Sequence, residues 1–370
     1  MRRAPGEGCR DRAVRQLSRR ERHLPIGGSV QVTTPGSARL DADAPGTVRL
    51  SVAEASALGM GALLRVGYSG EDAQIIVDQL VDNALCGYKF AGLPRILAIA
   101  GDEKTRKQRA PVKIVHETPV SALIDGGNNV GYIVAYRAAE AAIRKAKAAG
   151  MASVGAYNSY FSGRNAYFVE KIVREGLVAF HASSAYPRVL PPGAARPALG
   201  TNPICFGFPS DRGPVIFDMG TASLMWGEVM LHAHLGEPLP EGIGFDEQGR
   251  PSRDASAVLK GGVAPFGGHK GYGLSFAIQA LGILAGAALA KGEVRDYGFL
   301  FWVVDPQVML PGGQFQSQMS EYVRQIKALP RQPGVEAIRI PSERAMRERE
   351  RRREEGIVIE AKVVESLKTL

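Results

Sequence analysis

The sequence predicts an α/β fold in which helices and strands alternate along the chain and pack in layers. Helical apolar patterns alternate with short strand patterns between residues 70 and 181. The 44 glycines suggest many tight turns and close backbone approaches. No GxGxxG segment follows a predicted strand, so the usual dinucleotide-binding fingerprint is missing.

The individual elements follow from periodicity and from stop signals. Helices are expected at 70–86, 136–149 and 166–175. Gly150 and Gly176 directly follow the second and third of these patterns, where a glycine commonly ends a helix. Strands are expected at 112–115, 121–124, 153–157, 177–181 and 215–217, with a turn at 125–128.

The second half of the chain has fewer periodic segments. Residues 238–252 form a polar, turn-rich loop, and 266–271 form a glycine loop before an uncharged run at 271–290. This run is rich in Gly and Ala, so a helix buried in a core is favoured over a membrane span. In residues 343–355 acids alternate with bases at helical spacing, which predicts a helix with solvated faces.

Composition narrows the class of protein. The net charge is +9, and ten Arg against five acidic residues in 1–50 account for much of it, so nucleic-acid binding is disfavoured. Residues 1–47 read as a disordered basic extension; an Arg-rich transit peptide and an over-long start assignment both stay open. The three cysteines have no metal-site spacing, which favours a reducing, cytoplasmic location and no metal.

Three local segments suggest chemistry. In 267–271, glycines, a helix start and Lys270 suit an anion, although a tight turn explains them equally well. In 218–223, a carboxylate and hydroxyls at a strand end suit a ribose or pyrophosphate, or cap a helix. In 200–203, Thr201 and Asn202 could bind a carboxylate, or form a turn.

The order and spacing of several segments resemble one family. They are GTNP at 200–203, FDMGTAS at 217–223, LPEGIGFDEQGRPS at 239–252, GGHKGYGLS at 267–275 and IPSERAMRERERRREEGIVI at 340–359. Together they resemble the malate/L-lactate dehydrogenases that include sulfolactate and ureidoglycolate dehydrogenases and the piperideine/pyrroline-carboxylate reductases. The resemblance covers about 51–370. It implies a sulfolactate dehydrogenase-like mixed sheet layered with helices, a smaller helical domain, a nicotinamide cofactor and a homodimer.

The resemblance also implies site residues. The cofactor contacts would be Ser184, Asp218, Met219, Gly220, Thr221, His269, Lys270, Pro341, Ser342 and Glu343. The cofactor would be NADP or NAD, and the basic pair His269 and Lys270 leans toward NADP, because a 2′-phosphate favours positive charge. Substrate would contact Arg95, Thr201 and Asn202.

The same resemblance shows departures at the positions of the family's proton-transfer residues. Where the family has Ser-His before Gly92, this chain has Phe90 and Ala91, and Phe161 stands at another family histidine. Reduction of a ketone needs a proton donor, whereas a protonated imine does not. Tyr88, Lys89 and Tyr160 are the nearest catalytic replacements, and Arg95 can still clamp a carboxylate.

The expected protein is thus an NAD(P)H-dependent oxidoreductase that reduces C=N or C=O at C2 of a small imino or 2-oxo carboxylate. The alternative is a non-catalytic member that keeps the dimer scaffold. The expected domains are a helical region at 48–115, a cofactor-binding α/β domain at 116–315, and a C-terminal segment at 316–370 that completes the first domain.

Overall fold

The computed structural model describes residues 45–88, 90–290, 293–294 and 297–370. The chain divides into two units, residues 1–39 and 40–370, and all described residues belong to the second. The predicted disordered extension at 1–47 therefore lies almost wholly outside the described residues.

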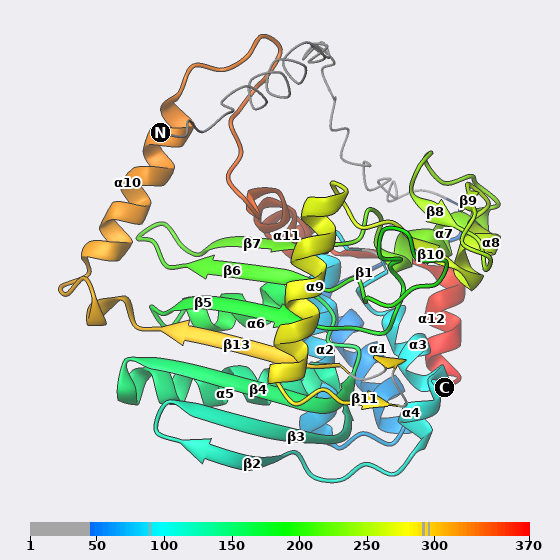
Figure 1. Ribbon diagram of the computed structural model, residues 1–370, viewed down its shortest axis with the longest axis horizontal. Helices are drawn as coiled ribbons and strands as arrows, with labels where there is room; N and C mark the ends of the chain where they lie inside the picture. The colour runs from blue at the N-terminus through cyan, green and yellow to red at the C-terminus, as the bar shows by residue number, and fades with distance from the viewer. Residues whose placement is uncertain (1–44, 89, 291–292, 295–296) are drawn as a thin grey trace, which may run out of the picture. The chain divides into compact units, whose positions relative to one another are not determined.

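A seven-stranded mixed sheet forms the centre of this unit, in the order β2-β3-β4-β13-β5-β6-β7 (Figure 1). The β3–β4 pair is parallel, and every other neighbouring pair is antiparallel. The mixed α/β architecture predicted from the sequence is confirmed. The strands are β2 (Lys113–Thr118), β3 (Ser121–Val130), β4 (Met151–Tyr160), β5 (Val178–Ser183), β6 (Ile204–Phe208), β7 (Val215–Met219) and β13 (Phe299–Val304).

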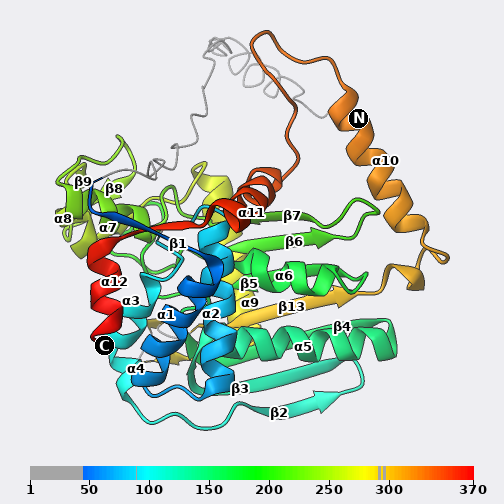
Figure 2. The same ribbon diagram turned by 180° about the vertical axis from the view of Figure 1, so that it is seen from behind.

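Two helices cover one face of this sheet, α5 (Gly131–Ala149) and α6 (Asn165–Val173) (Figure 2). The buried side of α5 is largely alanine, which lets the helix backbone approach the strands closely. Gly150 ends α5 in the left-handed conformation, with φ +81°, as the sequence predicts. Burial of this alanine-rich interface against aromatic and branched strand residues forms the largest apolar core.

The opposite face carries one helix, α9 (His269–Leu284), which crosses β5 and β13 (Figure 1). The sequence predicts a helix buried in a core at 271–290. This prediction of burial is wrong for the outer side of α9. Phe276 and Leu284 are 61% and 65% exposed. The predicted core packing applies only to the side with Gly271, Ser275 and Ile278. No helix within the described ranges is long and apolar enough to cross a membrane.

A helical unit packs beside the sheet and joins both ends of the described chain. The strand β1 (Thr47–Leu50) pairs with β14 (Ile357–Glu360), and their residues share a core with the helices. The helices of this core are α1 (Val52–Arg65), α2 (Gly70–Leu85), α3 (Arg95–Gly101) and α12 (Ala361–Lys368). Helix α4 (Glu103–Arg106) follows α3, and α11 (Glu343–Glu355) packs on α2. This packing is the basis on which we propose that 48–115 and 316–370 form one domain.

The remaining elements are short or peripheral. Residues 238–252 are not only loop, since two short strands there join a small sheet, and η1 (Pro306–Val308) follows β13. The small lobe contains α7 (Trp226–Leu235), β8 (Gly244–Phe245), β9 (Pro251–Ser252), α8 (Ala255–Lys260) and β10 (Gly262–Val263). The other elements are β11 (Leu289–Ala290), β12 (Glu293–Val294) and α10 (Gln314–Ala328).

The predicted turn at 125–128 is also wrong, because β3 continues to Val130. Gly127 and Asn128 have φ values of +60° and +59°, and the pairing with β4 is irregular between Asp125 and Asn129. The turn-forming residues therefore make a bulge within the strand instead of ending it.

Candidate functional site

The candidate site lies along one edge of the sheet. Phe161 follows β4, Tyr297 precedes β13, Ser184 follows β5, Asn202 precedes β6 and Asp218 lies near the end of β7. Because these strands are neighbours with alternating direction, all five positions meet at the same edge, on the side of α3 in Figure 1. The four spacings from β4 to β7 give an edge about 19 Å long. This edge is long enough for an extended ligand.

Hydrogen bonds join three of the predicted motifs at this edge. The Asn202 amide donates to the Ser275 carbonyl at 2.9 Å and to Gln279 Oε1 at 3.1 Å, in α9. The Thr221 hydroxyl lies 3.1 Å from the carbonyl oxygens of both Thr201 and Asn202. The Phe266 amide donates to the Thr221 carbonyl at 2.9 Å. These bonds fix the start of α9 beside the end of β7.

These polar side chains are therefore occupied within the protein. Asn202, Thr221 and Ser184 are fully buried. The Ser184 hydroxyl accepts from the Gly298 amide at 2.9 Å. The ligand contacts predicted for all three residues stay predictions, and their side-chain hydrogen bonds within the fold do not favour them. Thr201 is half-buried. Its carbonyl oxygen accepts a hydrogen bond from the Thr221 hydroxyl.

The glycine loop before α9 has free space in front of it. Gly267 and Gly268 have φ values of +56° and +62°, and no atom lies within 4 Å of a Cβ built on either residue. His269 and Lys270 are exposed, and Lys270 makes no ion pair with any described residue. Backbone amides, a 16-residue helix N-terminus and an unpaired ammonium group suit the phosphates of a dinucleotide.

The Asp218 carboxyl lies at the first turn of α6. Its Oδ2 accepts from the Ala166 amide at 2.7 Å. Burial raises the pKa of this carboxyl to about 6, and the Ala166 bond and the charge of Arg164 only partly oppose the increase. Met219 packs against the small core beneath α9, and a Cβ on Gly220 would lie 2.5 Å from the Met225 sulfur. Of these three positions, Asp218 offers the acceptor that a ribose hydroxyl needs.

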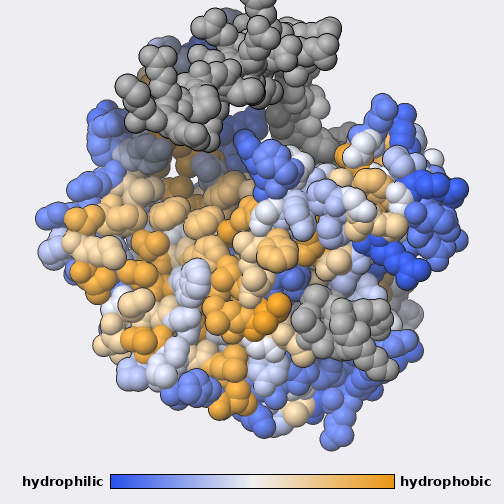
Figure 3. All heavy atoms as spheres, in the orientation of Figure 1, coloured by the Kyte–Doolittle hydropathy of each residue, from blue (hydrophilic) through white to orange (hydrophobic). Residues whose placement is uncertain are grey.

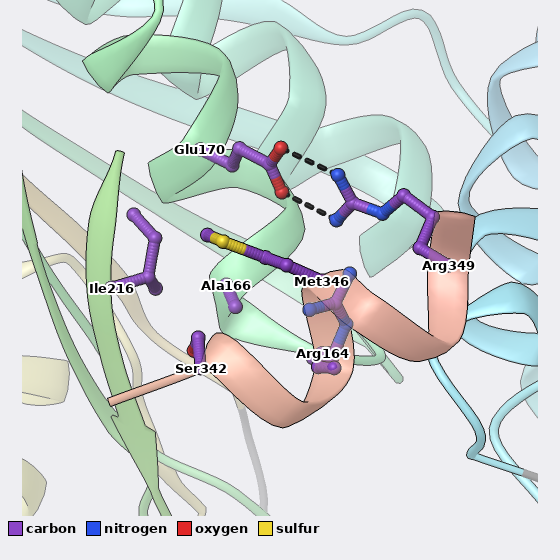
Figure 4. A pocket seen from close by; sticks show the side chains of 8 residues that line it. Arg164, Ala166, Glu170, Ile216, Ser342, Met346 and Arg349 are labelled. Carbon is purple, nitrogen blue, oxygen red and sulfur yellow. Dashed lines mark hydrogen bonds and ion pairs between the residues drawn. The ribbon is translucent and has the colours of Figure 1, made fainter. Parts of the chain in front are cut away.

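A small pocket next to Asp218 lies where the start of α11 meets the sheet (Figure 4). Ser342, which directly precedes α11, and Met346 of α11 face Ile216 of β7 across it. Glu343 is occupied locally, because its carboxylate accepts from the Ile340 amide at 3.1 Å and pairs with Lys327. Pro341 is exposed. The predicted segment 341–343 therefore lies by the end of β7, with Ser342 facing the pocket.

A buried ion pair closes one side of this pocket. Arg349 donates two hydrogen bonds of 2.6 Å to the Glu170 carboxylate (Figure 4). Burial alone would raise the pKa of Glu170, but the hydrogen bonds and charges of Arg349 and Arg174 together outweigh burial and lower that pKa to about 2. Arg349 also contacts Asp82 at 3.0 Å. The predicted solvated helix at 343–355 is therefore anchored on one side.

Arg95 begins α3 at the other end of the strand edge. Its guanidinium carbon lies 5.7 Å from the centre of the Phe161 ring, and it forms no ion pair with a described acid. The hydroxyl of Tyr132 is buried nearby and has no hydrogen-bond partner among the residues that the structure describes. Burial raises the pKa of Tyr132, and the charge of Arg95 opposes this increase. An unpaired, half-buried guanidinium suits a carboxylate.

The other predicted catalytic residues are not gathered around Arg95. Tyr160 is buried, and its hydroxyl pairs with the Thr105 hydroxyl at 2.7 Å, in the helical unit. The ring of Tyr88 lies between Arg164 and Arg344, at 5.6 and 5.9 Å. Lys89 lies outside the described residues. Of the four residues predicted to be catalytic, we therefore keep only Arg95 in the proposed site.

Three residues at the site were missed by the sequence analysis. They are Tyr132, Arg188 and Tyr297. The Arg188 guanidinium lies 4.7 Å from the Tyr186 ring and 4.3 Å from the Trp226 ring. Tyr297 immediately precedes Gly298 and β13, a strand that periodicity did not identify. A tyrosine and a glycine before the apolar run FLFWVV are the signal that could have located it.

Comparisons with known proteins agree with this architecture. The family model described as malate/L-lactate dehydrogenase matches residues 50–368. The L-sulfolactate dehydrogenase of Methanothermobacter thermautotrophicus is 34% identical over 80% of this chain and 89% of its own. A Delta(1)-pyrroline-2-carboxylate reductase of Ancylobacter novellus is 31% identical, over 87% of this chain and 97% of its own. The solved sulfolactate dehydrogenase of Methanocaldococcus jannaschii has a TM-score of 0.76, 29% identity, and coverage of 87% of this chain and 96% of its own.

Proposed function

Because the chain belongs to the malate/L-lactate dehydrogenase family, we propose that it is an NAD(P)H-dependent oxidoreductase. Its reaction is reduction of the C=N or C=O bond at C2 of a small imino or 2-oxo carboxylate. The observation that supports this proposal is the position of Arg95: its guanidinium forms no ion pair with a described acid and lies on the same strand edge as the glycine loop before α9. A bidentate bond from Arg95 would orient the substrate carboxylate and place C2 over the strand ends.

The cofactor would lie along the edge from Arg95 toward Asp218. The glycine loop and Lys270 would hold its phosphates, and the Asp218 carboxylate would accept from a ribose hydroxyl. When bound, the reduced nicotinamide supplies the hydride. His269 is a second basic residue beside Lys270. This pair favours NADP over NAD, because the 2′-phosphate of NADP adds negative charge that the pair can neutralise.

The substrate class follows from the residues that replace the family histidines. Three relatives are named as reductases of pyrroline carboxylate, a cyclic imine, and others as sulfolactate or malate dehydrogenases. Phe161 packs under Arg95, and Phe90 is exposed close to Gly227 of the small lobe. Neither side chain can donate a proton. We therefore propose that an imine, or a bulkier 2-oxo acid, is preferred over lactate or malate.

A second copy of the chain would cover the open face of the sheet. Trp302, Phe180, Phe206 and Phe217 occupy matching positions on four adjacent strands, and we call them the aromatic row. The row continues into the outer side of α9, and apolar side chains gather over this region (Figure 3). An exposed apolar face of this extent is typical of a protein interface. We propose that the chain is a homodimer through this face.

Replacement of Arg95 tests the proposed reaction. Arg95→Ala should lower kcat/KM by roughly 30-fold, or about 2 kcal/mol, for each carboxylate substrate, and leave cofactor affinity unchanged. The matched control is Arg106→Ala, an exposed arginine in α4, which should behave as wild type. Turnover of cyclic imines and 2-oxo acids is measured with NADH and NADPH. Unchanged turnover in Arg95→Ala would contradict the clamp, and binding without turnover in the wild type would favour the non-catalytic alternative.

A further inference from the structure

Arg188 packs against two aromatic rings beside the strand edge. Its guanidinium carbon lies 4.7 Å from the centre of the Tyr186 ring and 4.3 Å from the centre of the Trp226 ring. Its backbone amide donates to the Leu199 carbonyl at 2.8 Å, directly before the segment 200–203. The side chain is half-buried. Stacking on two rings and the backbone bond therefore hold this cation in one orientation next to the predicted site segments.

The hydrogen-bond donors of Arg188 are unused within the part of the chain that the structure describes. Burial lowers the pKa of Arg188, and the groups that oppose this decrease are two tyrosines rather than a carboxylate. By contrast, the buried arginines Arg164 and Arg349 both pair with carboxylates. A half-buried guanidinium that no described acid neutralises can take an anion through two parallel N–H bonds.

The segment that carries Arg95 lies against the same part of the small lobe. A Cβ built on Gly227, the residue after Trp226, would lie 3.9 Å from the Cβ of Phe90. Phe90 is 42% exposed and shortly precedes Arg95 in the chain. Both α3, which begins at Arg95, and α7, which begins at Trp226, lie off the same end of the strands (Figures 1 and 2). The two guanidinium groups therefore border the same region.

An electrostatic observation agrees with this placement. Burial raises the pKa of Tyr297, and the charges of Arg188 and Arg95 both oppose that increase. Tyr297 directly precedes β13, which lies between β4 and β5 in the sheet. The two cations thus approach one point of the strand edge from different elements.

The surroundings of Arg188 suit the far end of a substrate better than a cofactor phosphate. In the proposed function, the glycine loop and Lys270 at the start of α9 already hold the phosphates. Tyr186 and Phe90 are both partly exposed apolar rings, which suit the carbon chain of a substrate that extends from Arg95. A second cation at the end of such a chain matches a second acidic group.

We propose that Arg188 binds the distal carboxylate of a substrate with two carboxylates, while Arg95 binds the carboxylate next to C2. This inference rests on the proposed function and narrows its substrate to a 2-oxo or imino diacid. Bonds at both ends of the molecule fix C2 at the strand edge. Arg188 is then a specificity-determining residue that contributes to binding and does not touch the reacting atoms.

Two acids that differ only at the far end provide the test. 2-Oxoadipate carries a carboxylate where 2-oxohexanoate carries a methyl group, and 2-oxoglutarate and 2-oxopentanoate form the matching shorter pair. Arg188→Met should raise KM for the preferred diacid by about 30-fold or more, with kcat within about threefold. KM for the matching monoacid should stay within about twofold of wild type. Arg196→Met, an exposed arginine on the same segment, is the matched control and should behave as wild type.

The kinetic comparison has outcomes that overturn the proposal. Wild-type kcat/KM values that are equal within both pairs would show that the distal carboxylate is not recognised. An equal rise in KM for diacid and monoacid in Arg188→Met, or no rise for either, would show that Arg188 does not bind it. Unchanged KM for the monoacid in this variant also shows that the site is still folded.

Two binding measurements separate this role from a cofactor contact. Arg188→Met should bind NADPH within about twofold of wild type, and binding at least about tenfold weaker would assign Arg188 to a cofactor phosphate and overturn the proposal. Calorimetric titration with glutarate and with pentanoate needs neither cofactor nor turnover. Wild type should bind glutarate at least about tenfold more tightly than pentanoate, and Arg188→Met should bind them alike.

The same titrations distinguish a failure of this inference from a failure of the proposed function. Equal affinity of wild type for glutarate and pentanoate overturns the distal carboxylate site alone. A wild type that turns over no 2-oxo acid and no cyclic imine with either cofactor contradicts the proposed function itself.

Discussion

At the scale of single residues, Asp218 places an acidic group where the fold disfavours its charge. Its pKa is raised from 3.8 to about 6, mainly by burial. Because this pKa is higher in the folded state, the neutral Asp218 carboxyl contributes its full stabilisation of the fold below pH 3.8. That stabilisation is lost as the pH rises through 6. Above pH 6, the ionised carboxyl therefore destabilises the fold.

Asp218→Asn should raise the free energy of unfolding at pH 7.5, by at most about 3 kcal/mol, and the gain should vanish near pH 4. The amide keeps the bond from Ala166 but loses the charge that a ribose hydroxyl would meet, so cofactor affinity should fall roughly tenfold. Urea unfolding and cofactor titration check both effects. Asp211→Asn, at an exposed turn, is the control. A variant that is less stable than wild type at pH 7.5 would contradict this account.

His181 has the opposite dependence on pH. It is fully buried in β5 and stacks on Phe301 at 3.9 Å between ring centres. Burial lowers its pKa from 6.5 to about 4, and the bond to the Leu300 carbonyl only partly offsets this. The neutral ring thus contributes stability above pH 6.5 that is lost as pH falls toward 4.

His181→Phe should remove this dependence. The stability difference between wild type and variant should shift by about 3 kcal/mol in favour of the variant between pH 7.5 and pH 4. Equilibrium urea unfolding at several pH values measures it, with the exposed His234→Phe as control. A difference that stays constant across this range would show that the ring titrates normally.

The sequence predicted site segments better than side-chain roles. The motifs at 200–203, 217–223 and 267–275 do come together at one edge. However, a turn motif does not tell whether Asn202 faces a ligand or the fold, since both uses need the same amide.

At the scale of elements, α11 shows how a charged helix can be anchored by one buried residue. Arg349 bonds Glu170 of α6 and Asp82 of α2, and these three helices are thereby joined. Removal of Arg349 would leave Glu170 with the more exposed Arg174 and Asp82 with Arg164. Loss of the two-bond partner of the buried Glu170 carboxylate is strongly destabilising.

Arg349→Met should lower the free energy of unfolding by about 3–5 kcal/mol. The exposed Arg353→Met, four residues later on the same helix, should change it by less than about 0.5 kcal/mol. Chemical denaturation of both variants gives the comparison. Equal stability of the two variants would mean that the buried pair contributes nothing.

Helix ends were predicted well where a stop signal was present, and the buried strands at 153–157 and 177–181 were found, but β13 was not. The charged run at 343–355 coincides with α11, and Gly150 ends α5 as expected. By contrast, β13 is a continuous apolar run without alternation, because its central residues pack on both faces of the sheet. The exposed side of α9 was also missed, since an apolar helix gives no signal of what covers it.

At the scale of the whole molecule, the open sheet face determines the expected assembly. Leu284→Asp, on the outer side of α9, should convert the proposed dimer to a monomer, because it places a charge in an apolar interface. Leu64→Asp, on α1, is the matched control and should remain dimeric. Sedimentation velocity distinguishes these outcomes, and a monomeric wild type would contradict the interface.

The central claim is that the strand edge binds a nicotinamide dinucleotide. Titration of the protein with NADH and with NADPH, followed by nicotinamide fluorescence, tests it most directly. We predict saturable binding of at least one cofactor with a Kd below about 100 μM, tighter for NADPH, and weaker by roughly tenfold in Lys270→Ala. Binding of both cofactors that is absent or only near-millimolar would contradict the account.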